Sequence, residues 1–196
     1  LPKAVRAEPI EAKGVLYVAC SNGVLYAFKI GEKELEQIWA FETGGVLESS
    51  PYLAGKTIFI GSSNRKVYAV DAEKGTKLWE ASVGGPIQAT PLLSNSTLFV
   101  PCGDKSMYAF DTTQNGLPLW KFQTKGALRS SPLVVGAQVL FGSEDGKFYC
   151  VNARSGEQEW SFAARGPIRQ SAARGDGAVY FGSDDKSLYC VPIDVE

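Results

Sequence analysis

The stretch from Ser49 to Ala89 reads SSPYLAGKTIFIGSSNRKVYAVDAEKGTKLWEASVGGPIQA. Short runs rich in Val, Ile, Phe, Tyr or Trp alternate in it with clusters of Gly, Ser, Asn and Asp. Branched and aromatic side chains suit the pleated, half-buried surface of a strand. Gly, Asn and Asp permit tight reversals of the chain. Since no segment has a sustained helical period, the stretch predicts four short antiparallel strands.

The same pattern recurs through the whole chain with a period of about 40 residues. Tryptophans, tyrosines and prolines each mark one phase of it, and the tryptophans are spaced by 40, 41 and 40 residues. The markers are Trp39, Trp79, Trp120 and Trp160; Tyr26, Tyr68, Tyr108, Tyr149 and Tyr189; and Pro9, Pro51, Pro91 and Pro132, with Ala172 in the fifth copy. Three independent markers at one period identify an internal repeat.

Four-stranded units at this period are typical of β-propeller blades. One such sheet has two apolar faces and cannot cover both alone, so blades stack around an axis. The sequence predicts an all-β propeller forming a single domain, residues 1–196. The five copies fall at about 6–47, 48–87, 88–128, 129–168 and 169–196, and the last copy stops before its outer strand. We favour a closed five-bladed ring over an arc of a larger propeller.

The segment from Ala69 to Trp79, AVDAEKGTKLW, resembles the tryptophan-docking repeat of the quinoprotein-like (PQQ-like) β-propellers. The resemblance covers essentially the whole chain, although the first copy has Lys29 in place of the Asp and lacks the Gly. It implies that each Trp packs between blades, that the Asp accepts hydrogen bonds within its turn, and that the Gly takes a positive φ. The residues that it marks as structural docking residues are Trp39, Trp79, Trp120, Trp160, Asp71, Asp111, Gly75, Gly116 and Gly156.

Composition argues against several classes of function. The chain has no histidine, which removes His-based acid–base chemistry and the commonest transition-metal ligand. The 20 basic and 21 acidic residues leave a net charge of −1, without the basic excess typical of nucleic-acid binding. No apolar run is long enough to span a membrane.

The family also contains quinone-dependent dehydrogenases, so a PQQ-dependent oxidoreductase, or a fragment of one, is the alternative function. Such enzymes resemble this chain in fold but are longer. Many have adjacent cysteines beside the cofactor and a calcium site built from carboxylates, and neither stands out here. We therefore expect no enzymatic activity, no catalytic residue, no cofactor and no metal.

The four cysteines occupy positions that small residues fill in other copies, and none has metal-ligand spacing. Equivalent positions of adjacent blades tend to be too far apart for a bridge, so we predict no disulfide. The acidic segments Glu144-Asp145-Gly146 and Asp184-Asp185-Lys186 do not have the spacing of a calcium loop. We interpret them as hairpin turns.

One polar and variable position lies three residues before each marker proline, on or just before the innermost strand. It holds Arg6, Glu48, Gln88, Arg129 and Arg169. In a closed ring these side chains converge around the axis. We predict that they bind an anionic group or a carboxylate of a partner. The alternative is a collar in which Glu48 pairs with an Arg and the residues satisfy one another.

The last blade also exposes the edge of its third strand, from Ser187 to Pro192, because its outer strand is missing. An unpaired edge can pair with another chain, which predicts capture of a partner strand or homo-oligomerisation. Non-enzymatic members of the family imply a scaffold for protein–protein interaction or ligand sensing. They also imply an extracytoplasmic, periplasmic location, although this chain shows no signal peptide.

Overall fold

The protein is an all-β propeller arc, and this confirms the predicted fold class. The structure is a computed structural model that describes residues 1–193, and these residues form nineteen strands and no helix. The strands make four four-stranded sheets and one three-stranded sheet, each a run of consecutive antiparallel strands. We number these sheets as blades 1 to 5 along the chain.

Each blade follows the predicted order, with the short inner strand first. Blade 1 consists of β1 (Ile10–Ala12), β2 (Val15–Cys20), β3 (Val24–Ile30) and β4 (Leu35–Glu42). Blade 2 consists of β5 (Tyr52–Ala54), β6 (Thr57–Gly61), β7 (Lys66–Asp71) and β8 (Lys77–Ser82). Blade 3 consists of β9 (Leu92–Ser94), β10 (Thr97–Cys102), β11 (Ser106–Asp111) and β12 (Leu117–Gln123).

Blade 4 consists of β13 (Leu133–Val135), β14 (Gln138–Gly142), β15 (Lys147–Asn152) and β16 (Gln158–Ala163). Blade 5 has only β17 (Ala173–Gly175), β18 (Ala178–Ser183) and β19 (Ser187–Pro192). Within residues 1–193 it therefore lacks an outer strand, as the sequence predicts.

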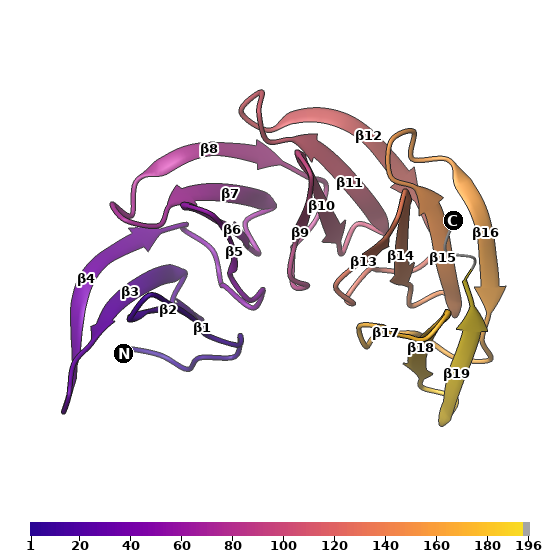
Figure 1. Ribbon diagram of the computed structural model, residues 1–196, viewed down its shortest axis with the longest axis horizontal. Coiled ribbons are helices and arrows are strands. Elements are labelled where there is room, and N and C mark those ends of the chain that lie inside the picture. Colours follow the sequence, from indigo (N-terminus) through magenta and orange to yellow (C-terminus); the bar gives the residue numbers. More distant parts are fainter. Residues whose placement is uncertain (194–196) are drawn as a thin grey trace.

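The closed ring that we favoured is wrong, because the blades form an open arc. Figure 1 shows blade 1 and blade 5 at opposite ends of the arc, separated by a wide opening, with the inner strands of the blades on the concave side. The sequence sets how one blade packs on the next. Closure instead depends on the rotation between neighbouring blades, which small differences in packing determine.

Two faces of the arc carry different connections. The upper face holds the turns between the second and third strands together with the connections between blades. For example, Ile87 in a connection donates its N–H to the carbonyl of Ser62 in such a turn, at 3.2 Å. The lower face holds the remaining hairpin turns, where Ala72 N–H donates to the carbonyl of Lys56 at 2.9 Å.

The hydrophobic core is divided into four clusters, and each lies between two neighbouring blades. The first joins Tyr17, Trp39 and Leu47 at the side of blade 1 to Ile58 and Val70 of blade 2. Equivalent clusters lie between blades 2 and 3, 3 and 4, and 4 and 5. Each sheet is thus stabilised by burial against its neighbour, as expected for a repeat architecture.

Candidate interaction surfaces

The tryptophans of blades 1 to 3 lie against the repeat glycine of the next blade. A Cβ added to Gly75 would meet the ring of Trp39 at 2.5 Å, and one added to Gly116 would meet Trp79 at 2.6 Å. A Cβ added to Gly156 would likewise meet the ring of Trp120 at 2.6 Å. Only a residue without a side chain allows the indole to approach so closely.

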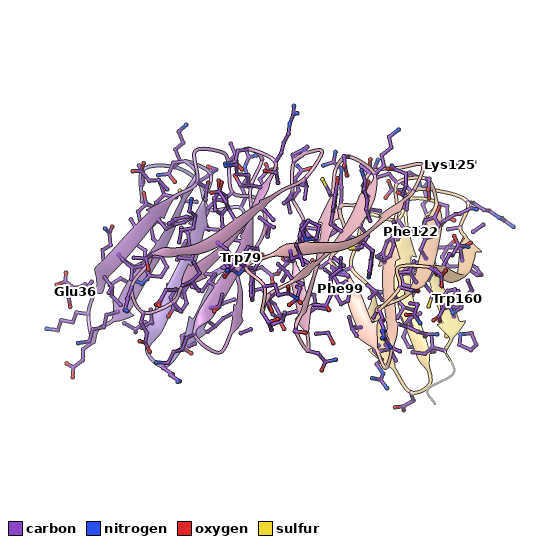
Figure 2. All side chains as sticks on the ribbon, turned by 90° about the horizontal axis from the view of Figure 1, so that it is seen from above. Glu36, Trp79, Phe99, Phe122, Lys125 and Trp160 are labelled. Carbon is purple, nitrogen blue, oxygen red and sulfur yellow. The ribbon has the colours of Figure 1, made fainter. Side chains whose placement is uncertain are left out.

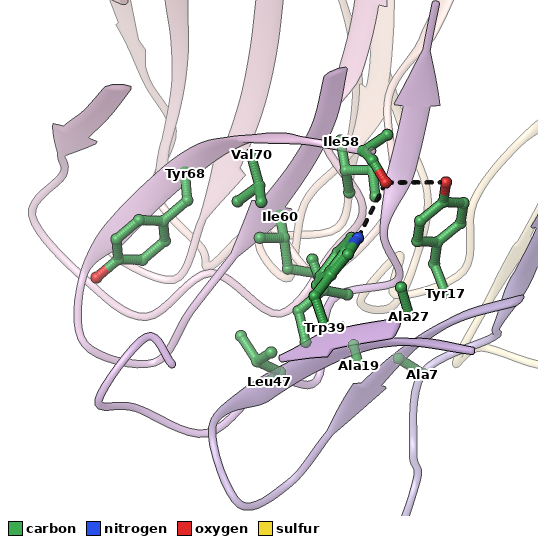
Figure 3. Packing of buried hydrophobic residues seen from close by; sticks show 12 residues of the cluster. Ala7, Tyr17, Ala19, Ala27, Trp39, Leu47, Ile58, Ile60, Tyr68 and Val70 are labelled. Carbon is green, nitrogen blue, oxygen red and sulfur yellow. Dashed lines mark hydrogen bonds between the residues drawn. The ribbon is translucent and has the colours of Figure 1, made fainter. Parts of the chain in front are cut away.

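A hydrogen bond fixes the orientation of two of these indoles. Trp39 Nε1 donates to the carbonyl of Ala72 in blade 2 at 3.1 Å, and Trp120 Nε1 donates to the carbonyl of Ala153 in blade 4 at 3.1 Å. Figure 3 shows that Tyr17 donates its hydroxyl to the same Ala72 oxygen, at 3.2 Å. The indole therefore contributes both buried area and a polar anchor to the contact between blades.

The turn that supplies each glycine is organised by an acidic or amide side chain. Asp71 Oδ1 accepts the N–H groups of Glu73 and Lys74, both at 2.9 Å, and the N–H of Lys74 is the main cause that lowers the Asp71 pKa. Gly75 then takes a φ of +68°, in the left-handed region that favours glycine. Asp111 organises the equivalent turn before Gly116.

The repeat tyrosines of blades 2 to 5 form a second contact between blades, for which we had no role from the sequence. Each tyrosine faces an Asp or Asn four residues earlier. Tyr149 donates to Asp145 Oδ2 at 2.9 Å, and that oxygen also accepts the N–H of Lys125 in the preceding connection, at 2.9 Å. The i, i+4 pairing of Asp or Asn with Tyr in every copy was the available signal. The pairs are Asn22 and Tyr26, Asn64 and Tyr68, Asp104 and Tyr108, Asp145 and Tyr149, and Asp185 and Tyr189.

The five predicted anion-binding residues lie in a line along the inner edge of the arc, which we call the inner polar row. Neighbouring members contact one another. Arg6 Nη1 lies 3.0 Å from Glu48 Oε1, and Gln88 Nε2 donates to Glu48 Oε2 at 2.7 Å. Arg129 donates to the Gln88 side-chain oxygen. The geometry therefore brings four of the five together directly.

Two acidic residues that we had interpreted only as turn residues complete the inner polar row. Arg129 Nε and Arg169 Nε donate to the same oxygen of Glu144, at 2.8 and 2.9 Å, and Arg169 also pairs with Asp184. Glu144 thus joins Arg129 to Arg169. Both carboxylates lie on upper-face turns, which meet the starts of the inner strands. That proximity follows from the topology and was the signal we missed.

These contacts favour the self-satisfied collar over a free anion site. The hydrogen bond from Gln88 is the main cause that lowers the Glu48 pKa, and the hydrogen bond from Arg169 is the main cause that lowers the Glu144 pKa. An incoming anion has to compete with these carboxylates for the guanidinium groups. Anion binding by the inner polar row remains a prediction.

Acid should destabilise the fold, because its carboxylates have lowered pKa values. The hydrogen bond from Tyr189 is the main cause that lowers the Asp185 pKa to about 2, and the Glu48, Asp71, Asp111 and Glu144 pKa values are lowered too. A lowered folded-state pKa contributes stability above the unfolded value, and this is lost as pH falls through the folded value. We expect the urea midpoint to be flat from pH ~8 to ~5 and to fall from pH ~4 toward ~2. A midpoint that falls between pH ~8 and ~6 would contradict this, since the chain has no histidine.

The cysteines are free thiols. Cys20, Cys102 and Cys150 are buried and Cys190 is exposed. Burial raises the pKa of the Cys102 thiol to about 12 and that of Cys150 to about 12. Cys102 and Cys150 are therefore poor nucleophiles at neutral pH.

Blade 5 presents an apolar face with no blade against it in residues 1–193. Tyr180 is 37% exposed, and its counterparts in the other blades, Tyr17, Phe59, Phe99 and Leu140, are all buried. Leu188 is 77% exposed, whereas its counterparts Leu25, Val67, Met107 and Phe148 are fully buried. This face is the surface on which each earlier blade receives the next one.

Comparison with known proteins places the chain in a family. The family model described as outer membrane protein assembly factor BamB matches residues 21–194. The chain belongs to the BamB family of PQQ-like β-propellers. BamB from Moraxella catarrhalis has a similar crystal structure, with a TM-score of 0.81, 19% identity, 95% of this chain covered and 57% of that chain covered.

The BamB-like fold also occurs in a computationally designed protein. The crystal structure of the designed Ika8 protein matches with a TM-score of 0.81 and 11% identity, covering 94% of this chain and 57% of that chain. The chain therefore spans little more than half the length of either neighbour. No curated protein sequence matches it.

Among residues 1–193, no three His, Cys, Asp or Glu side chains gather in an arrangement suited to a metal ion. The described part of the chain also contains no helix of sufficient length and apolarity to cross a membrane.

Proposed function

We propose that the protein is a non-catalytic scaffold that mediates protein–protein interaction or ligand sensing outside the cytoplasm. The observation that carries this proposal is the match to the BamB family over residues 21–194, a family described as an outer membrane protein assembly factor. The geometry agrees with it. The most regular side chains of the repeat, the tryptophans, tyrosines and turn glycines, pack blade on blade and are thus used for structure.

The direct test is an attempt to reconstitute quinone-dependent oxidation. The protein is incubated with pyrroloquinoline quinone and Ca²⁺, and the bound quinone is measured by absorbance alongside dye-linked dehydrogenase activity. We expect neither stoichiometric binding nor activity. Tight binding of one quinone per chain with activity would overturn the scaffold proposal in favour of the oxidoreductase.

The inner polar row gives the scaffold one candidate contact for a partner carboxylate. The double variant Arg129→Ala/Arg169→Ala removes two guanidinium groups and leaves Glu144 without its bonds to them. If the row binds carboxylates, the variant should lose affinity for a glutamate-containing peptide. Unchanged affinity would leave the row as a structural collar.

The edge of blade 5 gives a second candidate contact, with another copy of the chain. The outer edge of β19 has no strand beside it within residues 1–193, and Leu188 projects from this strand into solvent. We propose that two such edges pair antiparallel. Light scattering should show a mass that rises with concentration, and Leu188→Pro, which removes a main-chain N–H of β19, should abolish the rise. A strict monomer at high concentration would contradict homo-oligomerisation.

A further inference from the structure

The upper face carries basic side chains at positions where other copies of the repeat have glycine. The last residue of the turn between the second and third strands has a positive φ in every blade. It is glycine in two blades, Gly23 at +87° and Gly146 at +83°. In the other three it is Arg65 at +69°, Lys105 at +71° and Lys186 at +70°. A residue with a Cβ is strained in this region, so glycine would fit the turn better.

At a second position on the same face, some copies of the repeat also have glycine and others a basic residue. The connections that leave blades 1 and 2 contain Gly44 and Gly84, whereas those that leave blades 3 and 4 contain Lys125 and Arg165. The N–H groups of Lys125 and Arg165 donate to Asp145 and Asp185, each at 2.9 Å. Their backbones are thus fixed while their side chains are exposed. Figure 2 shows Lys125 at the upper edge of the molecule.

Together these residues form a line across blades 2 to 5, which we call the basic row. Its members are Arg65, Lys105, Lys125, Arg165 and Lys186. Thr124 donates to the carbonyl of Lys105 at 2.8 Å, which brings Lys105 beside Lys125. Arg165 and Lys186 are brought together by a different contact, because the N–H of Arg165 donates to Asp185, the residue before Lys186 in the next blade. The row therefore contains two close pairs, one in the seam between blades 3 and 4 and one between blades 4 and 5.

Four carboxylates that lie beside the basic row on this face accept hydrogen bonds or ion pairs from within the chain. Asp145 and Asp185 accept main-chain N–H groups and a tyrosine hydroxyl each. Glu144 and Asp184 pair with arginines of the inner polar row. Within residues 1–193, none of the five side chains of the basic row has an ion pair. Its charges are free to meet a ligand, and the three hairpin turns that present Arg65, Lys105 and Lys186 keep a residue with a positive φ in place of glycine.

We propose that the basic row docks an acidic segment of a protein partner along the upper face. Carboxylates spaced along an extended peptide can meet the paired cations of successive seams, and such charge complementarity mainly gives specificity and fast association. Nucleic acid is the less suitable polyanion, because the chain as a whole has no basic excess. The inference rests on the proposed scaffold function and names the chemistry of the partner.

The test uses three glycine substitutions that the repeat itself tolerates elsewhere. Binding of a fluorescent glutamate dodecamer to the whole chain is compared with binding to the variant Arg65→Gly/Lys105→Gly/Lys186→Gly, at about 50 mM and about 200 mM salt. The matched control is Lys13→Gly, which removes a lysine with a φ of +53° from the lower face. A glutamine dodecamer and a thymidine dodecamer serve as comparison ligands.

We expect the glutamate peptide to bind with an affinity that falls with salt and drops about tenfold in the triple variant. We expect Lys13→Gly to leave the affinity unchanged. Because glycine relieves left-handed strain, the triple variant should be at least as stable as the parent, which separates lost binding from lost folding. Equal affinity of parent and triple variant, equal binding of the glutamine peptide, or tighter binding of thymidine each overturns the proposal. These outcomes leave the scaffold function standing, since that function fails only if quinone-dependent activity is found.

Discussion

Replacing Trp79 with alanine is expected to lower the free energy of unfolding by about 3–5 kcal/mol. The indole is only 8% exposed, its ring lies 5.8 Å from that of Phe59, and its far face rests on Gly116 of blade 3. Truncation removes these contacts and leaves a cavity between two blades that the sheets cannot readily close. Urea unfolding of the two proteins, followed by far-UV circular dichroism, measures the difference in the free energy of unfolding.

The matched control is Trp160→Ala. The ring centroid of Trp160 lies 6.4 Å from that of Phe148, but the Trp160 side chain is partly exposed. Within the described residues, no glycine of blade 5 lies against its ring. Truncation of the tryptophan in blade 4 should therefore lower the free energy of unfolding clearly less than truncation of the tryptophan in blade 2. Equal losses at the two positions would mean that the indoles stabilise their own sheets and not the contact between blades.

Gly142→Ala should destabilise the protein by about 1–3 kcal/mol, while Gly182→Ala should change stability by less than ~0.5 kcal/mol. The two glycines are equivalent residues of blades 4 and 5. A Cβ on Gly142 would lie 2.3 Å from Cγ2 of Ile168, which comes from the connection into the next blade. A Cβ on Gly182 would have no atom within 4 Å. Neither residue has a positive φ, so backbone strain does not enter the comparison.

This pair of variants also tests whether the face of blade 5 is open in solution. If another chain or sheet covers that face, Gly182→Ala meets the same obstruction as Gly142→Ala. A loss of stability at Gly182 comparable to that at Gly142 would show the face to be covered. Unequal losses measured by urea unfolding at low protein concentration would support the open arc.

The sequence was sufficient to predict the blade and how often it occurs. The period of the tryptophans placed the outer strands, and the missing fifth marker foretold the three-stranded sheet of blade 5. The alternation of apolar and turn residues in 49–89 predicted four antiparallel strands, and the structure places them between Tyr52 and Ser82. These features are local to one repeat, and local periodicity is what a single sequence expresses most strongly.

Ring closure and the neighbours of the inner polar row were not predictable in the same way. Closure depends on small rotations summed over several blades, and no single residue specifies them. The row was recognised from Arg6, Glu48 and their counterparts, but Glu144 and Asp184 reach it from turns that are distant in sequence. The tertiary structure determines which carboxylate pairs with which guanidinium group. Comparison of the repeat copies in the sequence does not contain this information.

A double-mutant cycle on Trp79 and Gly116 tests the contact between blades most directly. A Cβ on Gly116, whose φ is +77°, would lie 2.6 Å from Cε3 of Trp79, so Gly116→Ala should combine a clash with backbone strain. In the Trp79→Ala background the clash disappears and only the strain remains. We expect Gly116→Ala to cost at least ~1 kcal/mol less there than in the parent. Costs that agree within about 0.5 kcal/mol in the two backgrounds would contradict the docking of each indole on the glycine of the next blade.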